Sequence, residues 1–199
     1  MFLMHGAHFA KSYVSTYLNN DIPTRIVSYR NGWNLDSEQL PSPEKYLTYE
    51  PIALDAWPTI ITVAISMSGM ERDGWYKGNP EYRVKYSMRT YVWVRDEGSD
   101  AATMMRDRLT TVVRSALLDR PCLKATDPRE TFMALIDEGT LREEYSDLTL
   151  LKGDRVLAGA YLSYDLEINE IVAREDVGTV SEFQLMEVVA GPTGGAFDL

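Results

Sequence analysis

The stretch VLAGAYLSYDLEINEI, residues 156–171, decides the fold of this chain, because its side chains alternate between apolar and polar. Such alternation is typical of a β-strand that lays one face on a hydrophobic core. The apolar face would consist of Val156, Ala158, Ala160, Leu162, Tyr164, Leu166 and Ile168. The opposite face would carry Gly159, Ser163, Asp165, Glu167 and Asn169. So long a polar face must meet water, charges on another strand, or a partner molecule.

A second long strand is predicted over residues 81–96, and its polar face is basic and aromatic. The apolar face would consist of Tyr82, Val84, Tyr86, Met88, Thr90, Val92 and Val94. The opposite face would carry Arg83, Lys85, Ser87, Arg89, Tyr91, Trp93 and Arg95. Opposite charges on neighbouring strands contribute roughly 0.2–1 kcal/mol for each pair. The basic residues therefore complement Asp165, Glu167 and Glu170, either within one sheet or between the sheets of neighbouring subunits.

Two segments have the periodicity of amphipathic helices. In residues 99–120 apolar side chains recur at spacings of three and four, and Ser99 is a suitable N-cap. Residues 7–18 show a similar pattern near the N-terminus. This first helix is expected to end before Pro23, because proline removes a helical hydrogen bond. Residues 24–31 are then expected to form a short strand.

The remaining segments fit connections and shorter strands. Residues 59–68 fit a strand with Ile61, Val63, Ile65 and Met67 on one face. Residues 69–81 fit a hairpin loop, and the proline-rich residues 31–58 fit a long loop or insertion. Further expectations are a hairpin around Glu138–Gly139, a turn at 153–154, a strand over 181–189 and a C-terminal extension over 172–199.

Together these elements predict an α+β fold, with a single domain over residues 1–171. We expect a mostly antiparallel, twisted sheet of about four or more strands, with two helices packed on one face. The other face of the sheet is expected to stay polar. An extended loop and a C-terminal arm complete the expected architecture.

Composition and charge narrow the functional classes. The chain has 199 residues, a formal net charge of -10 and a pI near 4.7. Such an acidic protein is poorly suited to grip phosphate backbones, which requires clustered Lys and Arg. The single cysteine, Cys122, allows no intramolecular disulfide and fits a reducing compartment. Without a signal-peptide pattern or a long apolar run, the chain is expected to be soluble and made in the cytoplasm.

No catalytic motif stands out in the sequence. His5 and His8 are the only histidines, and no carboxylate or cysteine follows them at metal-ligand spacing. No motif places a base beside Cys122. The acidic clusters fit solvated faces or ion pairs better than general acid–base pairs. We therefore expect no enzyme activity, no cofactor and no metal.

Aromatic residues provide the two main binding hypotheses. Trp75 and Tyr76 lie between turn signals and are candidates for a protein interface, since Trp and Tyr are enriched in binding hot spots. Tyr91 and Trp93 lie on the basic strand face. They fit either cross-strand packing or a base-stacking platform for single-stranded nucleic acid. The acidic net charge disfavours the platform.

Four segments follow one another along most of residues 7–171: FAKSYVSTYL (9–18), YSMRTYVWVRDEG (86–98), SDAATMMRDRLTTVVRSALL (99–118) and AGAYLSYDLEINE (158–170). They are an amphipathic helix, a long strand ending in Val-Arg-Asp, an immediate helix and a late long strand. In this order the chain resembles the tail terminator proteins of long-tailed, siphovirus-type bacteriophages. The resemblance is one of pattern and contains no diagnostic short motif.

The resemblance implies a virion protein of the tail or neck, assembled in the host cytoplasm as a homo-hexameric ring. Such a ring ends polymerisation of the major tail tube protein and joins the tail to the head connector, or stopper, protein. Genomic DNA passes through it as cargo, and no membrane is involved. Two alternatives stay open: another head–tail connector or tail-completion protein, and a small nucleic-acid-binding module. The candidate interface residues are Trp75, Tyr76, Arg83, Lys85, Arg89, Asp165 and Glu167.

Overall fold

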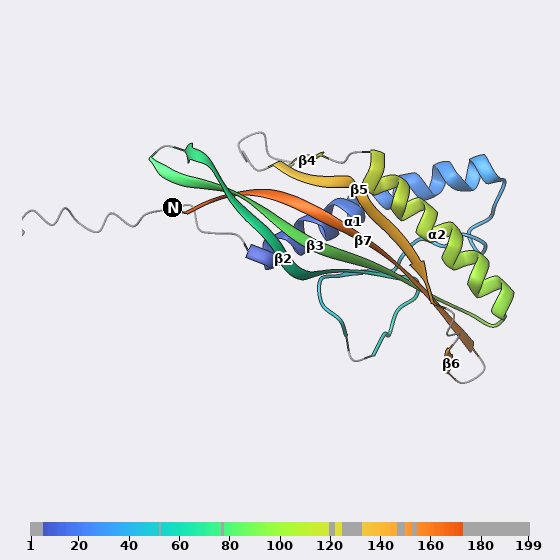
Figure 1. Cartoon of the computed structure of the whole chain (residues 1–199). Helices are drawn as coiled ribbons and strands as arrows, with labels where there is room; N and C mark the ends of the chain where they lie inside the picture. The colour runs from blue at the N-terminus through green and yellow to red at the C-terminus, as the bar shows by residue number, and fades with distance from the viewer. Residues whose placement is uncertain are drawn as a thin grey trace, which may run out of the picture.

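The computed structural model describes residues 6–51, 53–76, 78–119, 122–124, 133–146, 150–152 and 155–172. These residues form two helices, each followed along the chain by a group of strands (Figure 1). The elements are α1 (Gly6–Trp33), β1 (Lys45–Leu47), β2 (Thr59–Tyr76), β3 (Asn79–Asp96), α2 (Ser99–Asp119), β4 (Cys122–Lys124), β5 (Met133–Tyr145), β6 (Leu150–Lys152) and β7 (Arg155–Ile171).

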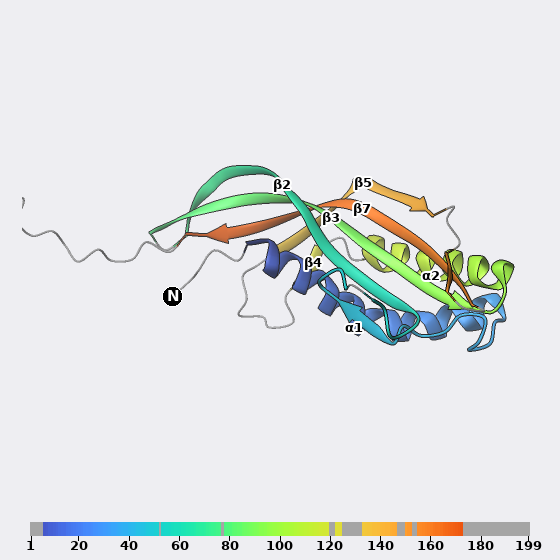
Figure 2. The same ribbon diagram turned by 90° about the horizontal axis from the view of Figure 1, so that it is seen from below.

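The seven strands of the described residues form one sheet in the order β1-β2-β3-β7-β5-β4, and β6 pairs with β7 beside this path. β1 runs parallel to β2, whereas the other pairings among these strands are antiparallel. Both helices lie on the same side of the sheet (Figures 1 and 2). The predicted α+β fold, with two helices on a mostly antiparallel sheet, is confirmed.

The two long strands predicted from alternation are β3 and β7, and they lie side by side in the middle of the sheet. Their register runs unbroken from Glu81 opposite Ile171 to Asp96 opposite Val156. The apolar face predicted for β7 is buried under the helices, and Leu162 and Leu166 have no exposed surface. Paired residues on antiparallel strands share a face, so the apolar faces of β3 and β7 form one continuous apolar surface beneath the helices.

The first helix is longer than predicted, and the strand expected over residues 24–31 is wrong. α1 continues through Pro23 to Trp33. Proline in a helix interior costs about 3 kcal/mol, whereas burying Ile22 and Ile26 contributes roughly 1.5–3 kcal/mol each. Burial therefore outweighs the lost hydrogen bond. The fully buried stripe recurs every four residues at Ala10, Val14, Leu18, Ile22 and Ile26.

The second helix, α2, ends within one residue of its predicted boundary. Asp100 lies in its first turn, where the helix dipole favours a negative charge. Its core-facing side packs on β3, β7 and α1. That side consists of Ala102, Met105, Leu109, Val112, Val113, Ala116 and Leu117.

Residues 69–81 form strand rather than the predicted hairpin loop, because β2 reaches Tyr76 and β3 begins at Asn79. Register shifts between Ala64 and Ser66, and twice more before Gly74, show that β2 is bulged. A bulge adds a residue and interrupts the alternation of faces. The single face predicted for Ile61, Val63, Ile65 and Met67 is therefore wrong, since Ile61 pairs with Tyr91 whereas Met67 pairs with Tyr86 on the opposite face.

The hairpin predicted around Glu138–Gly139 is also wrong. β5 is one strand, and its pairing with β7 jumps from Asp137–Asp165 to Arg142–Ser163. Residues 138–141 therefore form a bulge. Thr140 holds the bulge in place, because its hydroxyl donates to the Asp137 carbonyl at 2.7 Å and accepts the Asp165 N–H at 2.8 Å. The glycine signal marked a bulge instead of a chain reversal.

Other expectations concern connections. The proline-rich segment is mostly a connection, as predicted, but it contains β1, and its first residues belong to α1. β6 and β7 pair as a hairpin, whose turn at 153–154 lies outside the described residues. The strand expected over 181–189 and nearly all of the extension over 172–199 also lie outside them.

Candidate interface on the helix-free face of the sheet

The side of the sheet opposite the helices carries charged and aromatic residues, and we call it the open face. The odd-numbered residues of β3 from Arg83 to Arg95 and those of β7 from Leu157 to Asn169 point to this side, since their even-numbered neighbours face the core. The burial pattern of both strands alternates accordingly between buried and half-buried. This is the surface that the alternating sequence pattern predicted.

Lys85 lies at the centre of a carboxylate cluster on the open face. Its Nζ is 3.3 Å from Asp137 Oδ2, 3.5 Å from Asp165 Oδ2 and 3.8 Å from Glu167 Oε1. Ser87 donates to Asp165 Oδ1 at 3.0 Å. The hydrogen bond to Asp137 and the nearby carboxylates raise the pKa of Lys85. The predicted complementarity between basic β3 and acidic β7 is thus met within one chain, around a single lysine.

Three carboxylates around one ammonium leave this cluster with an excess of two negative charges. Asp137 and Asp165 are also direct cross-strand partners. Like charges directly opposite each other destabilise a sheet. The positive charge of Lys85 therefore reduces the repulsion between Asp137 and Asp165.

Arg89 interacts with tyrosines and makes no ion pair with a carboxylate in the described part of the chain. Its guanidinium carbon is 4.3 Å from the centre of the Tyr161 ring. Its Nη1 donates to the Tyr91 hydroxyl at 3.3 Å. The Tyr161 hydroxyl in turn donates to Glu144. Arg89 Nε is buried and has no hydrogen-bond partner among the described residues.

The other predicted interface residues lie on the distal part of the β2–β3 hairpin, residues 67–86, which we call the arm. The arm projects beyond the start of α1 (Figures 1 and 2). Arg83 pairs with Asp73 of the arm at 3.1 Å rather than with β7. Trp75 is 55% exposed, and the Arg72 guanidinium lies 4.3 Å from its ring centre. Tyr76 ends β2, and its backbone pairs with Asn79.

The aromatic residues considered as a base-stacking platform are engaged with their own sheet. The Tyr91 and Tyr161 ring centres are 5.6 Å apart. The Trp93 ring lies so close to Gly159 that a Cβ there would be only 2.7 Å from Trp93 Cζ3. Both residues therefore serve cross-strand packing, one of the two roles that the sequence left open.

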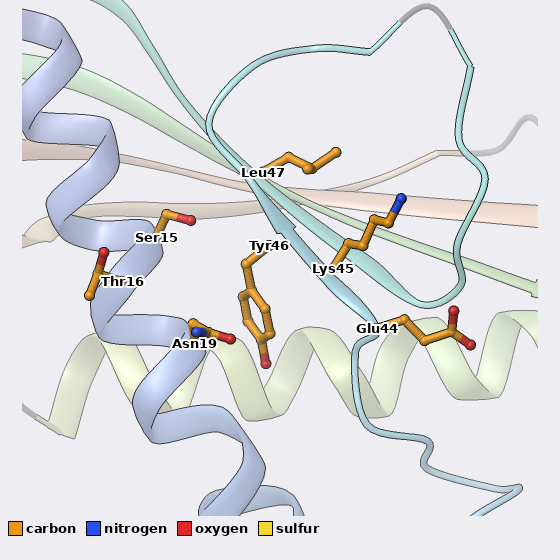
Figure 3. Close-up of a pocket in the computed structure, with 7 residues that line it drawn as sticks. All are labelled: Ser15, Thr16, Asn19, Glu44, Lys45, Tyr46 and Leu47. Carbon is orange, nitrogen blue, oxygen red and sulfur yellow. The ribbon is translucent and has the colours of Figure 1, made fainter.

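A polar cleft that sequence reasoning missed lies between α1 and β1 (Figure 3). It has a volume of about 340 Å³. The Tyr46 hydroxyl nearby is buried without a hydrogen-bond partner in the described residues, and burial raises the pKa of this phenol. One wall of the cleft is β1, which pairs in parallel with β2. Its lining residues are Ser15, Thr16, Asn19, Glu44, Lys45, Tyr46 and Leu47.

Comparison with protein-family models and with curated proteins gives no match. In the described ranges, no group of three or more His, Cys, Asp or Glu side chains is placed to hold a metal ion. No helix in these ranges is long and apolar enough to cross a membrane. The open face and the arm carry the interface residues predicted from the sequence, and we take them as the candidate functional surfaces.

Replacing Lys85 by methionine is expected to lower the Tm at pH 7. The raised pKa of Lys85 means that its stabilising charge is present below pH 10.5 and is lost as the pH rises through the folded-state pKa. Carboxylates lose their charge near pH 4 in water, so the deficit of Lys85→Met should shrink toward that pH. Thermal unfolding of both proteins between pH 4 and pH 10 measures this dependence.

Arg95→Met is the matched control, because Arg95 lies on the same face over the Trp57 ring, 5.4 Å from its centre. Its Tm deficit should not change between pH 7 and pH 4. A Lys85→Met deficit that is equally independent of pH would contradict the counterion role.

Proposed function

We propose that the protein is a structural component of a bacteriophage tail, a ring-forming terminator that closes the head-proximal end of the tail tube. The observation that carries the proposal is the division of the sheet into a helix-covered face and an open face with charged and aromatic side chains along its length. A subunit that contacts its own copies and two other proteins needs mixed surfaces of this kind. The four segments behind the resemblance lie in α1, β3, α2 and β7.

The arm supports the proposal with a second contact surface. Trp75 is largely exposed and is stacked by Arg72, and these two residue types are enriched in interface hot spots. Because the arm extends past the helical layer, a partner can reach it without meeting the rest of the subunit. In the proposed assembly, the arm contacts the tube protein.

The charge of the open face also suits a ring through which DNA passes. The Lys85 cluster has an excess of negative charge, and the whole chain carries -10. Such a surface holds phosphates weakly, which a conduit requires. The nucleic-acid-binding alternative loses support, since Tyr91 and Trp93 already pack within the sheet.

Tube assembly with the cognate major tube protein tests the proposal. Light scattering should give the protein a mass of about 136 kDa, six times 22.6 kDa, alone or with tube protein. Added during polymerisation, it should stop tube elongation and leave shorter tubes by electron microscopy. A protein that stays monomeric and leaves tube length unchanged contradicts the terminator role. A ring that binds no tube protein favours another connector of the neck.

In the same assay, Trp75→Ala is expected to reduce tube capping by roughly tenfold or more, the loss typical of a hot-spot tryptophan. The folded subunit should keep its Tm, because Trp75 is 55% exposed. Trp33→Ala is the control, since Trp33 is also exposed, at 41%, and has an aromatic neighbour, Tyr29, but lies outside the arm. Equal capping by both variants would contradict the role of the arm.

A further inference from the structure

The bulges of β2 sort the side chains of the arm onto two different faces. In a regular strand Met67 and Met70 would point to opposite sides of the sheet, because the alternation has a period of two. Two of the register shifts, after Met67 and after Arg72, each add one residue to β2. Each shift moves the residues that follow it to the other side of the sheet. Three apolar side chains of the arm therefore pair with even-numbered residues on the helix side of β3: Met67, Met70 and Trp75.

These three residues form an apolar surface, which we call the arm patch. Each of them is at least 40% exposed. The Arg72 guanidinium lies on the same side, over the Trp75 ring. Because the apolar residues are gathered on this side, a molecule that buries apolar surface would approach the arm from the helix side. Small or acidic residues of β2 pair toward the opposite side: Ser66, Gly69, Glu71 and Gly74.

The arm patch points to the side of the sheet on which α1 begins (Figures 1 and 2). Gly6, the first residue of α1, donates its N–H to Glu170 Oε1 at 3.2 Å. Glu170 pairs with Tyr82 of β3, and Tyr82 pairs with Arg72 of β2. Neighbouring strands are about 4.8 Å apart, so β2 is about 10 Å from β7 along this row. Five extended residues span up to about 17 Å, so the segment before Gly6 can reach the arm patch.

The segment that precedes Gly6 is itself apolar. Residues 1–5 read Met-Phe-Leu-Met-His and lie outside the described residues. The chain also leaves the arm at Val172, whose N–H donates to the Pro80 carbonyl at 3.0 Å. The next residues there, 173–176, read Ala-Arg-Glu-Asp, and charged side chains are costly to place on an apolar surface. Residues 1–5 therefore match the arm patch better in both position and polarity.

We infer that residues 1–5 pack on the arm patch of their own subunit and cover it until the arm meets its partner. Their attachment to α1 favours this contact, because it gives the segment a high effective concentration at the patch. A partner then has to displace five residues and no folded layer. The contact follows from the geometry of one chain, and only its role in controlling access to the arm rests on the proposed function.

Disulfide trapping in the full chain tests the contact. Cys122→Ser first removes the only cysteine. In that background, Leu3→Cys with Met70→Cys should form an intrachain disulfide roughly tenfold faster or more than Leu3→Cys with Glu71→Cys. Glu71 is the matched control, because it is the next residue of β2 but pairs with Arg83 toward the open face. Peptide mapping by mass spectrometry distinguishes intrachain from interchain bonds, and circular dichroism confirms that each variant is folded.

Three results would overturn the contact. The first is an equal rate for the Met70 and Glu71 pairs. The second is a disulfide that joins two chains, which would place the segment of a second copy on the patch. The third is a faster bond from Phe183→Cys than from Leu3→Cys to Met70→Cys, which would show that the C-terminal extension occupies the patch.

Binding of the tube protein measures the control of access. Phe2→Ser with Leu3→Ser should raise the apparent affinity for tube protein by roughly threefold or more, because the patch is then open in more of the subunits. Val27→Ser, which changes an exposed apolar residue of α1, should leave the affinity unchanged. An unchanged affinity in the double variant would overturn the control of access. A trapped contact in a protein that never binds tube protein would contradict the proposed function alone, whereas tube capping without a trapped contact would contradict only this inference.

Discussion

Replacing Gly159 by alanine is expected to destabilise the protein by about 1–3 kcal/mol, the usual cost of overpacking a filled site. The new Cβ would lie 2.7 Å from Trp93 Cζ3 and 2.9 Å from both Cε3 and Cη2 of the same ring. Real Cβ atoms do not approach so closely, so the indole or the β7 backbone must move. Gly159→Val should lower the free energy of unfolding by more than Gly159→Ala does, because valine adds two further methyl groups. Urea unfolding at equilibrium measures both differences.

Two companion variants make this prediction specific. Gly69→Ala should cost little, because a Cβ there would meet only Lys85 Cβ at an ordinary 3.8 Å. In a Trp93→Ala background, Gly159→Ala should become nearly neutral, since the ring that clashes is absent. If Gly159→Ala lowers the free energy of unfolding equally with and without the Trp93 ring, then Trp93 is not the reason why glycine is needed at position 159.

Glu170→Ala is expected to have the other large effect, a loss of about 2–3 kcal/mol and a fall of roughly 5–10 °C in Tm. Glu170 is a fully buried acidic residue, and its Oε1 accepts from the Tyr86 hydroxyl at 2.7 Å, whereas its Oε2 has no partner in the described residues. The Gly6 N–H donates to the same oxygen at 3.2 Å. Alanine would leave the buried Tyr86 hydroxyl without this acceptor and would remove the carboxylate from the start of α1.

The position of Glu170 explains why the chain keeps a carboxylate there. The first turn of α1 contains no acidic residue, so Glu170 at the end of β7 supplies the negative charge that a helix N-terminus favours. Glu170→Gln is the control, because its amide oxygen can still accept from Tyr86 and Gly6, and it should cost less than about 1 kcal/mol. Equal losses for Ala and Gln would show that charge, not the hydrogen bonds, stabilises this end of the sheet. Differential scanning calorimetry measures the two variants.

Part of the fold follows from local pattern, and the failures have physical causes. The bounds of α2 matched the prediction, because the apolar residues, the N-cap and the terminating proline in its sequence all agree with the way the helix packs. The end of α1 did not match, because Pro23 is a strong local signal for the end of a helix. The buried apolar residues that outweigh this signal are buried only when the sheet packs against the helix. Residues 69–81 carry turn signals but became strand, because β2 and β3 pair with each other along them. Residues 138–141 also carry a turn signal but became a bulge, because the pairing of β5 with β7 resumes at Arg142.

The candidate site was predicted only as a set of charges. The charge complementarity between Lys85 and Glu167 could be predicted from the polar faces of the two long strands. Their direct pairing follows from the register of β3 and β7. The ion pair between Asp137 and Lys85 could not be predicted, because β5 comes close to Lys85 only through its pairing with β7. The tyrosine environment of Arg89 was also hidden, since Tyr161 belongs to the strand next to it.

Sequence alone determined which side of each long strand is apolar, because alternation with a period of two leaves one arrangement that buries the apolar set. It also determined that the opposite side is charged on both strands. Tertiary structure decided whether those charges meet, since β3 and β7 are far apart in the chain and become neighbours only in the sheet. Lys85 lies within ion-pair distance of carboxylates of its own chain, whereas Arg89 packs against tyrosine rings and makes no ion pair in the described residues. Only the geometry of the folded sheet distinguishes the two.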